Sequence, residues 1–210
     1  MYLPTSARLL SSSEWTIVNR VLGPHLPFRQ RVFVTNGAGA DNRPFTIPTS
    51  LVSSLVDFGP AILSSAFLSL LTTNPLILAS IGATSGFLAE VSSFTNLAYF
   101  MNVGPSFYPD LTRRNRSNQF LDASATLVHE TMHVWQGKNS WFAMTYVFSS
   151  VLNQAFKGGG AYTYRTGDPW RSMNAEQQAK LVEDWYWRSG ESVTDTRYPY
   201  IRDFVRKGIA

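Results

Sequence analysis

The sequence predicts an α+β fold that is mostly helical and carries a small β-sheet. Its clearest helix lies at 122–137, where two histidines stand four residues apart in a largely uncharged stretch. Two further stretches, 11–22 and 174–186, join capping residues to good helix formers. Runs of β-branched and aromatic residues, which are typical of strands, lie at 31–35, 45–47 and 97–101.

The first predicted helix runs from about Ser11 to Leu22. Ser11 and Glu14 form a capping-box pattern, in which each side chain accepts a hydrogen bond from the other residue's backbone N–H. Gly23 and Pro24 follow, and both residue types are poor at continuing a helix, so its end is predicted there.

The first predicted strand, 31–35, is followed by the turn-forming pair Asn36-Gly37 and then by the run 45–47. This order predicts either a hairpin or two separate strands. A further strand is expected at 97–101, shortly before the helix that carries the two histidines.

Residues 58–89 contain no charged side chain. Their purest apolar stretch, 61–71, is about half of the roughly twenty residues that a membrane-spanning helix needs. We therefore interpret the segment as two short buried helices around Asn74-Pro75. The alternative is a hairpin that contacts a membrane.

Residues 129–133 match the HExxH zinc signature. Residues four apart lie above one another on one helix face, so His129 and His133 can reach the same metal ion. Glu130 can take a proton from water at that ion. Composition produces such a pattern by chance in roughly one chain in a thousand. The alternative is a core helix whose histidines bind buried carbonyl groups.

The residues around this signature suit a buried helix. Positions 126–128, 131, 132, 134 and 135 are all uncharged. Asp122 or Ser124 can cap the start of the helix, and Gly137 followed by Lys138 suits its end.

The composition favours a catalytic metal site over a structural one. A structural zinc usually takes four protein ligands that include cysteine, and the chain contains no cysteine. The third histidine, His25, lies far upstream and is expected in a surface turn. A downstream carboxylate is therefore the expected third ligand.

Glu176 is the preferred third ligand, because it opens the next predicted helix and a rigid helix positions a ligand well. Glu183 lies seven residues later on the same helix face and is the alternative. In the preferred arrangement, Glu183 or Asp184 holds a ligand histidine by its other nitrogen. These carboxylates could also form a solvated face that pairs with Lys180 and Arg188.

Segments 126–136 and 174–186 resemble the zincin-like metallopeptidases of gluzincin type, whose third ligand is a Glu on a later helix. The runs His-Val-Trp-Gln and Asn-Ala-Glu-Gln-Gln also resemble small HExxH domains associated with the Vgr and Rhs effectors of bacterial secretion systems. The resemblance implies a β-sheet over the HExxH helix, a catalytic Zn²⁺ and hydrolysis of peptide bonds.

By the same resemblance the catalytic general base is Glu130, and the metal ligands are His129, His133 and Glu176. Gluzincins commonly carry an acid four residues after the Glu ligand, where this chain has Lys180. This departure leaves two alternatives: the partners of the histidines are built differently, or the ligand is Glu183.

A loop between the two site helices contains candidate donors to the oxyanion that forms during hydrolysis. It starts with three glycines, 158–160, which are expected to end a helix at 141–156. The candidate donors are Tyr162, Tyr164 and Arg165. The alternative is that the tyrosines only pack and the glycines only turn. A last short helix is predicted near 200–207.

The composition sets the remaining expectations. No linker divides the 210 residues, which predicts one domain, 1–210. The basic cluster Arg113, Arg114 and Arg116 suits a solvated loop, an acidic substrate or an anionic membrane, and no motif indicates nucleic-acid binding. The start lacks a recognisable signal peptide, so we expect a cytoplasmic protein or one exported through a secretion system.

The expected function is a zinc-dependent metallopeptidase that acts on a peptide or protein substrate. The alternative is a non-catalytic zincin-fold adaptor or carrier module that binds a partner in a bacterial secretion system. A third interpretation is a zinc amidase that acts on cell-wall peptide. Chelation separates the first two, because it stops cleavage by a peptidase and unfolds an adaptor that depends on its metal.

Overall fold

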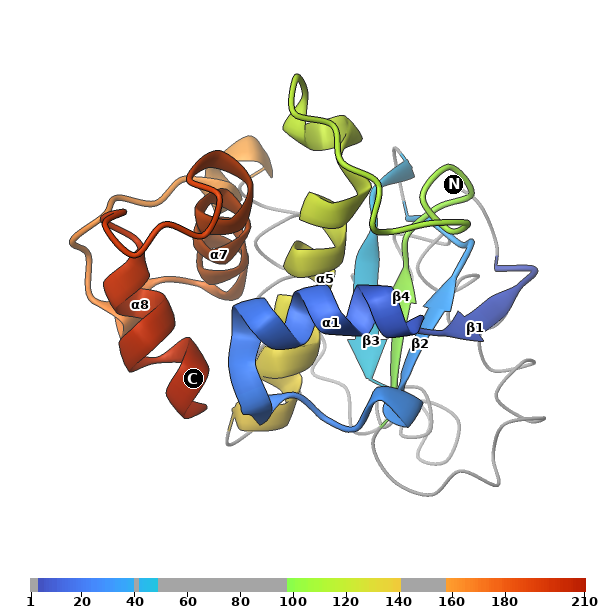
Figure 1. Ribbon diagram of the computed structural model, residues 1–210, viewed down its shortest axis with the longest axis horizontal. Coiled ribbons are helices and arrows are strands. Elements are labelled where there is room, and N and C mark those ends of the chain that lie inside the picture. The colour runs from blue at the N-terminus through green and yellow to red at the C-terminus, as the bar shows by residue number, and fades with distance from the viewer. Residues whose placement is uncertain (1–3, 40–41, 49–97, 141–157) are drawn as a thin grey trace, which may run out of the picture. The chain divides into compact units, whose positions relative to one another are not determined.

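The fold is α+β, as the sequence predicts. The computed structural model describes residues 4–39, 42–48, 98–140 and 158–210 (Figure 1). The chain groups into two compact units, Met1–Leu10 with Gln30–Pro109 and Ser11–Arg29 with Asp110–Ala210. Every described strand belongs to the first unit and every described α-helix to the second. The assignment of one domain to 1–210 stays a prediction.

The first unit contains a four-stranded mixed sheet. Its strands are β1 (Ala7–Leu9), β2 (Val32–Thr35), β3 (Phe45–Pro48) and β4 (Tyr99–Asn102), in the spatial order β1-β2-β4-β3. The pair β2–β4 is parallel, and the pairs β1–β2 and β3–β4 are antiparallel. The three predicted strands are confirmed, but the hairpin alternative is wrong because β4 lies between β2 and β3.

Contacts between β2 and β4 explain why these two strands pair. Phe33 stacks on Phe100 with ring centroids 5.3 Å apart, and every residue of β4 is buried. At the ends of the strands, Thr35 Oγ1 donates to Asn102 Oδ1 over 2.7 Å. A parallel pair needs a long crossover connection, so the turn signal directly after β2 could not predict its partner.

The described part of the second unit contains four α-helices with 3-10 turns between them. They are α1 (Ser12–Leu22), α5 (Ala123–Asn139), α7 (Ala175–Arg188) and α8 (Tyr198–Asp203). The helix predicted near 200–207 corresponds to α8 and the 3-10 turn Val205–Lys207.

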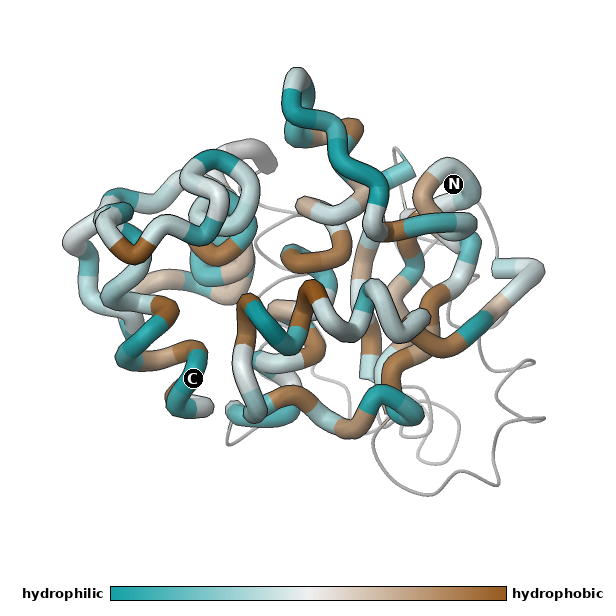
Figure 2. Tube along the Cα trace, viewed as in Figure 1, coloured by the Kyte–Doolittle hydropathy of each residue, from teal (hydrophilic) through white to brown (hydrophobic). Residues whose placement is uncertain are grey.

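Helix α1 begins and ends as predicted. Ser11 Oγ accepts a hydrogen bond from the Glu14 N–H, and Glu14 Oε2 accepts one from the Ser11 N–H over 2.7 Å. Gly23 ends the helix with φ 76°, a backbone conformation that favours glycine. Val18 and Val21 are buried, whereas Asn19 and Arg20 between them are exposed. The tube of α1 accordingly carries both brown and teal segments (Figure 2).

The start of α5 is fixed by the buried carboxylate of Asp122. It accepts hydrogen bonds from the Ala125 N–H at 2.8 Å and from the Ser124 hydroxyl at 2.6 Å. The Trp187 indole of α7 donates to the same carboxylate over 3.0 Å. One cap therefore sets both the beginning of α5 and its position against α7.

The end of α5 differs from the prediction. The helix continues through Gly137 to Asn139, and Gly137 is not among the described glycines with positive φ. The Asn139 amide donates to the carbonyl groups of Trp135 and His25. These bonds extend the helix by satisfying backbone oxygens near its last turn, so the predicted end at Gly137 is wrong by two residues.

Helix α7 begins with a capping box between Asn174 and Gln177. Near its end Trp185 is buried and stacks on Tyr198, with ring centroids 5.9 Å apart. Trp170, ahead of the helix, stacks on Phe204 with centroids 5.6 Å apart. These aromatic contacts connect α7 and the turn before it to the C-terminal segment.

Two predictions lie outside the described residues, the helix at 141–156 and the apolar segment 58–89. The glycines 158–160 belong to a 3-10 helix, Gly158–Tyr162. Among the helices in the described ranges, none combines the length and hydropathy that a membrane span requires. Membrane contact through 58–89 stays a prediction.

Candidate metal centre

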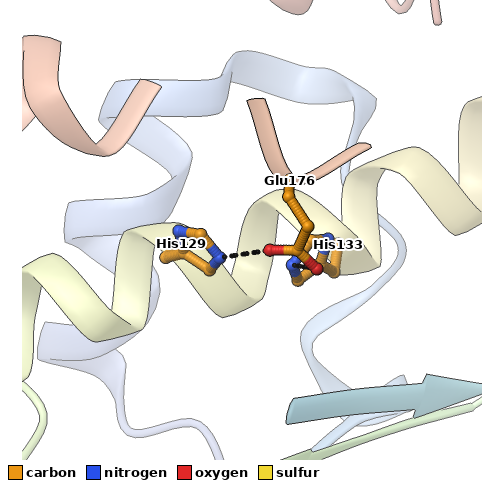
Figure 3. A group of neighbouring side chains, drawn as sticks. All are labelled: His129, His133 and Glu176. Carbon is orange, nitrogen blue, oxygen red and sulfur yellow. Dashed lines mark hydrogen bonds and ion pairs between the residues drawn. The ribbon is translucent and has the colours of Figure 1, made fainter. Parts of the chain in front are cut away.

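Helices α5 and α7 bring three residues together into a group that could hold a metal ion. His129 and His133 lie one turn apart on α5, and Glu176 lies in the first turn of α7 (Figure 3). Each residue offers one ligand atom, and these atoms lie within 4.8 Å of one another. Two helices from one unit thus supply the whole group.

The Glu176 carboxylate lies between the two imidazole rings (Figure 3). Its Oε2 is 3.3 Å from His129 Nε2, and its Oε1 is 3.5 Å from His133 Nε2. Its side chain is fully buried, which excludes a solvated helix face at this position. Burial raises the pKa of a carboxyl group, but the charges and hydrogen bonds of His133 and His129 outweigh burial and hold the pKa of Glu176 well below its ordinary value.

The other nitrogen of His129 meets a second carboxylate. His129 Nδ1 is 3.0 Å from Glu183 Oε2. Glu183 Oε1 accepts hydrogen bonds from Gln119 Nε2 at 2.7 Å and Lys180 Nζ at 3.1 Å. Glu183 is buried and held from two sides, so it fixes the orientation of the His129 ring.

The other nitrogen of His133 meets a neutral amide. His133 Nδ1 is 2.8 Å from Gln136 Oε1. Gln136 Nε2 donates to the Ala175 carbonyl and to Gln178 Oε1, each over 2.9 Å. Because the amide nitrogen is occupied by two acceptors, the amide oxygen must accept from His133, which assigns the proton to Nδ1.

These partners turn the Nε2 atoms of both rings toward Glu176. With Nδ1 as the donor on each ring, Nε2 of a neutral imidazole carries the lone pair that binds a metal. Two imidazole nitrogens and one carboxylate oxygen are typical Zn²⁺ ligands. The donor set and its hydrogen-bonded partners therefore fit a zinc ion.

Both histidines have raised pKa values. Burial disfavours the imidazolium, but hydrogen bonds to Glu176 and Glu183 outweigh burial and raise the pKa of His129 to about 10. Burial also opposes protonation of His133, and the charge of Glu176 outweighs it and raises that pKa as well. A metal ion that binds at neutral pH must therefore displace at least the proton of His129.

Glu130, the predicted base, is buried on α5 beside His129. Its charge is near enough to His133 to contribute to the raised pKa of that imidazole. A carboxylate in this position lies in the same charged environment as the three candidate ligands.

The three candidate oxyanion donors lie in different places. The Tyr162 ring centroid is 6.1 Å from that of His129. The Tyr164 hydroxyl donates to Asp184 Oδ2 over 2.9 Å, whereas Arg165 is exposed. Burial and the nearby Asp184 raise the pKa of Tyr164, so its hydroxyl keeps its proton. Of these three residues, Tyr162 is the one with a ring contact to a candidate ligand.

Three further carboxylates that follow the HExxH motif in the sequence form ion pairs with arginines. Glu191 pairs with Arg20, Asp195 with Arg197 and Asp203 with Arg202. His25 lies in the 3-10 turn Gly23–His25 and is not part of the group that could hold a metal. Within the described residues, that group contains only His129, His133 and Glu176.

Sequence reasoning assigned no role to three glutamines at this site. Gln136 has a signal in the sequence, because it follows His133 by three residues and such pairs are neighbours on a helix surface. Gln119 and Gln178 have no comparable signal, since their partners come from other parts of the chain.

Comparisons of the chain with protein-family models, curated proteins and solved structures found no match.

Proposed function

We propose that the chain is a zinc-dependent metallopeptidase with His129, His133 and Glu176 as metal ligands. The observation that carries the proposal is the fully buried Glu176 carboxylate, which lies within 3.5 Å of both imidazoles. Three protein ligands are typical of catalytic zinc sites, which keep a fourth position for water or substrate. The absence of cysteine from the sequence agrees with this ligand set.

The hydrogen bonds behind the ligands support the same proposal. Zinc-binding histidines usually donate their second N–H to a carboxylate or carbonyl oxygen, which fixes the ring and strengthens it as a ligand. His129 has Glu183 in this role, and His133 has Gln136. Lys180 stands where gluzincins commonly have an acid, and its bond to Glu183 gives it a supporting role instead.

A zinc ion in this site would supply Lewis-acid chemistry that acidifies water and polarises the scissile carbonyl group. Glu130 accepts the proton of the attacking water and later delivers it to the leaving amine. Tyr162 is the proposed donor to the developing oxyanion, because its ring contacts His129 and the Tyr164 hydroxyl is occupied by Asp184.

The proposal includes a zincin-like fold of gluzincin type, since the described chain contains a mixed sheet, an HExxH helix and a later Glu-bearing helix. It also includes the substrate class, a peptide or protein, and a partner in a bacterial secretion system. The proposed location is the cytoplasm, or the outside of the cell after export without a signal peptide.

Replacing the base while keeping the ligands tests the proposal. Glu130→Gln should bind one zinc per chain as the wild type does, and should cleave an unfolded protein such as casein about 10²- to 10⁴-fold more slowly. Asp203→Asn, which removes a surface carboxylate paired with Arg202, is the matched control and should cleave normally.

Three outcomes decide between the functions. Loss of cleavage with retained zinc supports the peptidase. Full activity of Glu130→Gln contradicts the mechanism. If chelation unfolds the protein and no substrate is ever cleaved, the metal has a structural role and the adaptor function replaces the peptidase.

A further inference from the structure

An open pocket of about 460 Å³ is lined by residues of α7 and of the loop before it, next to residues of the candidate metal centre. Its lining includes Tyr162, whose ring contacts His129, and Asp184, which follows Glu183 on α7. Its volume lies within the range of about 300–1,000 Å³ that is usual for ligand sites. A peptide bound at the metal centre could therefore place a neighbouring group in this pocket.

The pocket is lined by more cations than anions. One carboxylate, Asp184, faces four cations, which are Arg165, Lys180, Arg188 and Arg197. Asp184 Oδ1 binds Lys180 Nζ and Arg188 Nε, each over 3.1 Å. Asp195, outside the lining, pairs with Arg197 over 3.0 Å. Three of the cations are thus held in place by carboxylates.

Several guanidinium donors in the pocket are not used by described residues. Arg165 is exposed, and its side chain makes no hydrogen bond or ion pair with a described residue. Among the described residues, Arg188 has one hydrogen-bond partner, Asp184, which accepts from its Nε. Arg197 Nε is buried and has no hydrogen-bond partner among the described residues. The exposed Arg165 guanidinium and the terminal nitrogens of Arg188 are therefore the donors that an anion in the pocket could meet.

We infer that this pocket binds a carboxylate group of the peptide substrate. The inference rests on the proposed function and adds the substrate class, peptides with an acidic group near the scissile bond. Guanidinium groups match a carboxylate with two parallel N–H bonds, which a neutral amide cannot replace. The carboxylate comes either from an Asp or Glu side chain or from the free C-terminus of the peptide.

Binding of paired peptides tests the inference. The protein is zinc-loaded Glu130→Gln, which should bind without cleaving, and the readout is fluorescence anisotropy at low and high NaCl. The probes are labelled octapeptides with Glu or with Gln at one central position, each with a free or an amidated C-terminus. We expect about tenfold tighter binding of one acidic form, with the difference reduced by salt.

Arg165→Gln is the informative second substitution, because Arg165 is exposed and its loss breaks no described ion pair. It should reduce the preference for the acidic peptide to about threefold or less. Arg171→Gln is the matched control, since Arg171 is also exposed but lies outside the pocket lining, and it should leave the preference intact. The source of the carboxylate is an acidic side chain if the Glu peptides bind more tightly than the Gln peptides. It is the C-terminus if the free forms bind more tightly than the amidated forms.

Equal binding of all four peptides, or an unchanged preference in Arg165→Gln, overturns the inference. Cleavage by the zinc-loaded wild type is then measured on the same peptides. If every peptide is cleaved at one rate, the proposed peptidase function stands and the proposed carboxylate binding by the pocket is wrong. If peptides bind selectively and none is cleaved, the pocket binds a carboxylate and the proposed peptidase function is wrong.

Discussion

His129 and His133 lie one turn apart on α5 and share Glu176, but the regions behind them differ. Behind His129 lies a charged network of Glu183, Lys180 and Gln119. Behind His133 lies a neutral one, in which the Gln136 amide binds Ala175 and Gln178.

Equal spacing on a helix therefore does not give the two histidines equal electrostatic surroundings. Burial disfavours the His129 imidazolium, but the shared Glu176 and the Glu183 carboxylate behind the ring together raise its pKa to about 10. An amide behind His133 fixes the ring without adding a charge. Variants of Glu183, of Gln136 and of the shared Glu176 separate these contributions.

Removing the shared carboxylate should have the largest effect. Glu176→Ala removes one of the three proposed zinc ligands. Zinc affinity should therefore fall by more than the roughly 10- to 100-fold that is lost when a residue hydrogen-bonded to a ligand is replaced. Competition with a fluorescent chelator measures the change, and Asp203→Asn should show none. An unchanged affinity of Glu176→Ala would mean that another residue, such as Glu183, is the third ligand.

Making the neutral side charged should destabilise the fold. In Gln136→Glu a buried carboxylate faces two oxygen acceptors, Ala175 O and Gln178 Oε1, so we expect a loss of about 3 kcal/mol in unfolding free energy. Urea unfolding of the metal-free protein at neutral pH measures it. Gln30→Glu is the control, because Gln30 is an exposed surface residue, and its stability should stay within about 0.5 kcal/mol. Equal stability of the two variants would contradict the role assigned to Gln136.

Making the charged side neutral should weaken zinc binding without unfolding the protein. In Glu183→Gln the new amide must still accept from Gln119 and Lys180, so its NH₂ group would face His129 Nδ1 and favour the ring tautomer that blocks Nε2. We expect a decrease in zinc affinity of about 10- to 100-fold. Calorimetric titration measures it, and full affinity would show that Glu183 does not orient His129.

The pH dependence should be the smallest effect, about tenfold in zinc affinity per pH unit for each displaced proton. His129 has a pKa of about 10 in the metal-free fold, so zinc should release its proton at pH 7.5 and bind more tightly as the pH rises toward 10. Calorimetry in buffers of different ionisation enthalpy counts the released protons. Release of no proton at pH 7.5 would contradict the charged His129 network.

Stability of the metal-free protein should have a related pH dependence. The raised pKa of His129 contributes stability that is fully present below pH 6.5, its ordinary pKa, and is lost as the pH rises through about 10. The lowered pKa of Glu176 contributes stability that is present above 4.5 and is lost as the pH falls through its folded-state pKa. The stabilising contribution of His129 and Glu176 to the unfolding free energy should therefore be largest between pH 4.5 and pH 6.5.

The sequence predicts local features of the fold and of the site because short-range rules determine them. The HExxH spacing, the cap at Asp122 and the capping box at Ser11 each depend on residues within one helical turn. The sequence also predicted that Glu183 or Asp184 holds a ligand histidine by its other nitrogen. In the structure Glu183 Oε2 lies 3.0 Å from His129 Nδ1. Glu183 lies seven residues after Glu176 and therefore on the same helix face, which is why its place beside the histidines could be predicted from the sequence.

Contacts between distant segments could not be predicted in the same way. The parallel pairing of β2 with β4 and the bond from Gln119 to Glu183 depend on how far separated parts of the chain meet. The continuation of α5 past Gly137 similarly depends on Asn139, whose amide reaches His25. Tertiary contacts override local signals at these positions.

Diffraction from crystals at the zinc absorption edge tests the central claim most directly. The account predicts one anomalous peak per chain, in contact with His129 Nε2, His133 Nε2 and the Glu176 carboxylate. Protein purified without chelator and supplied with zinc that shows no peak there, or a peak bound by other residues, would contradict the account.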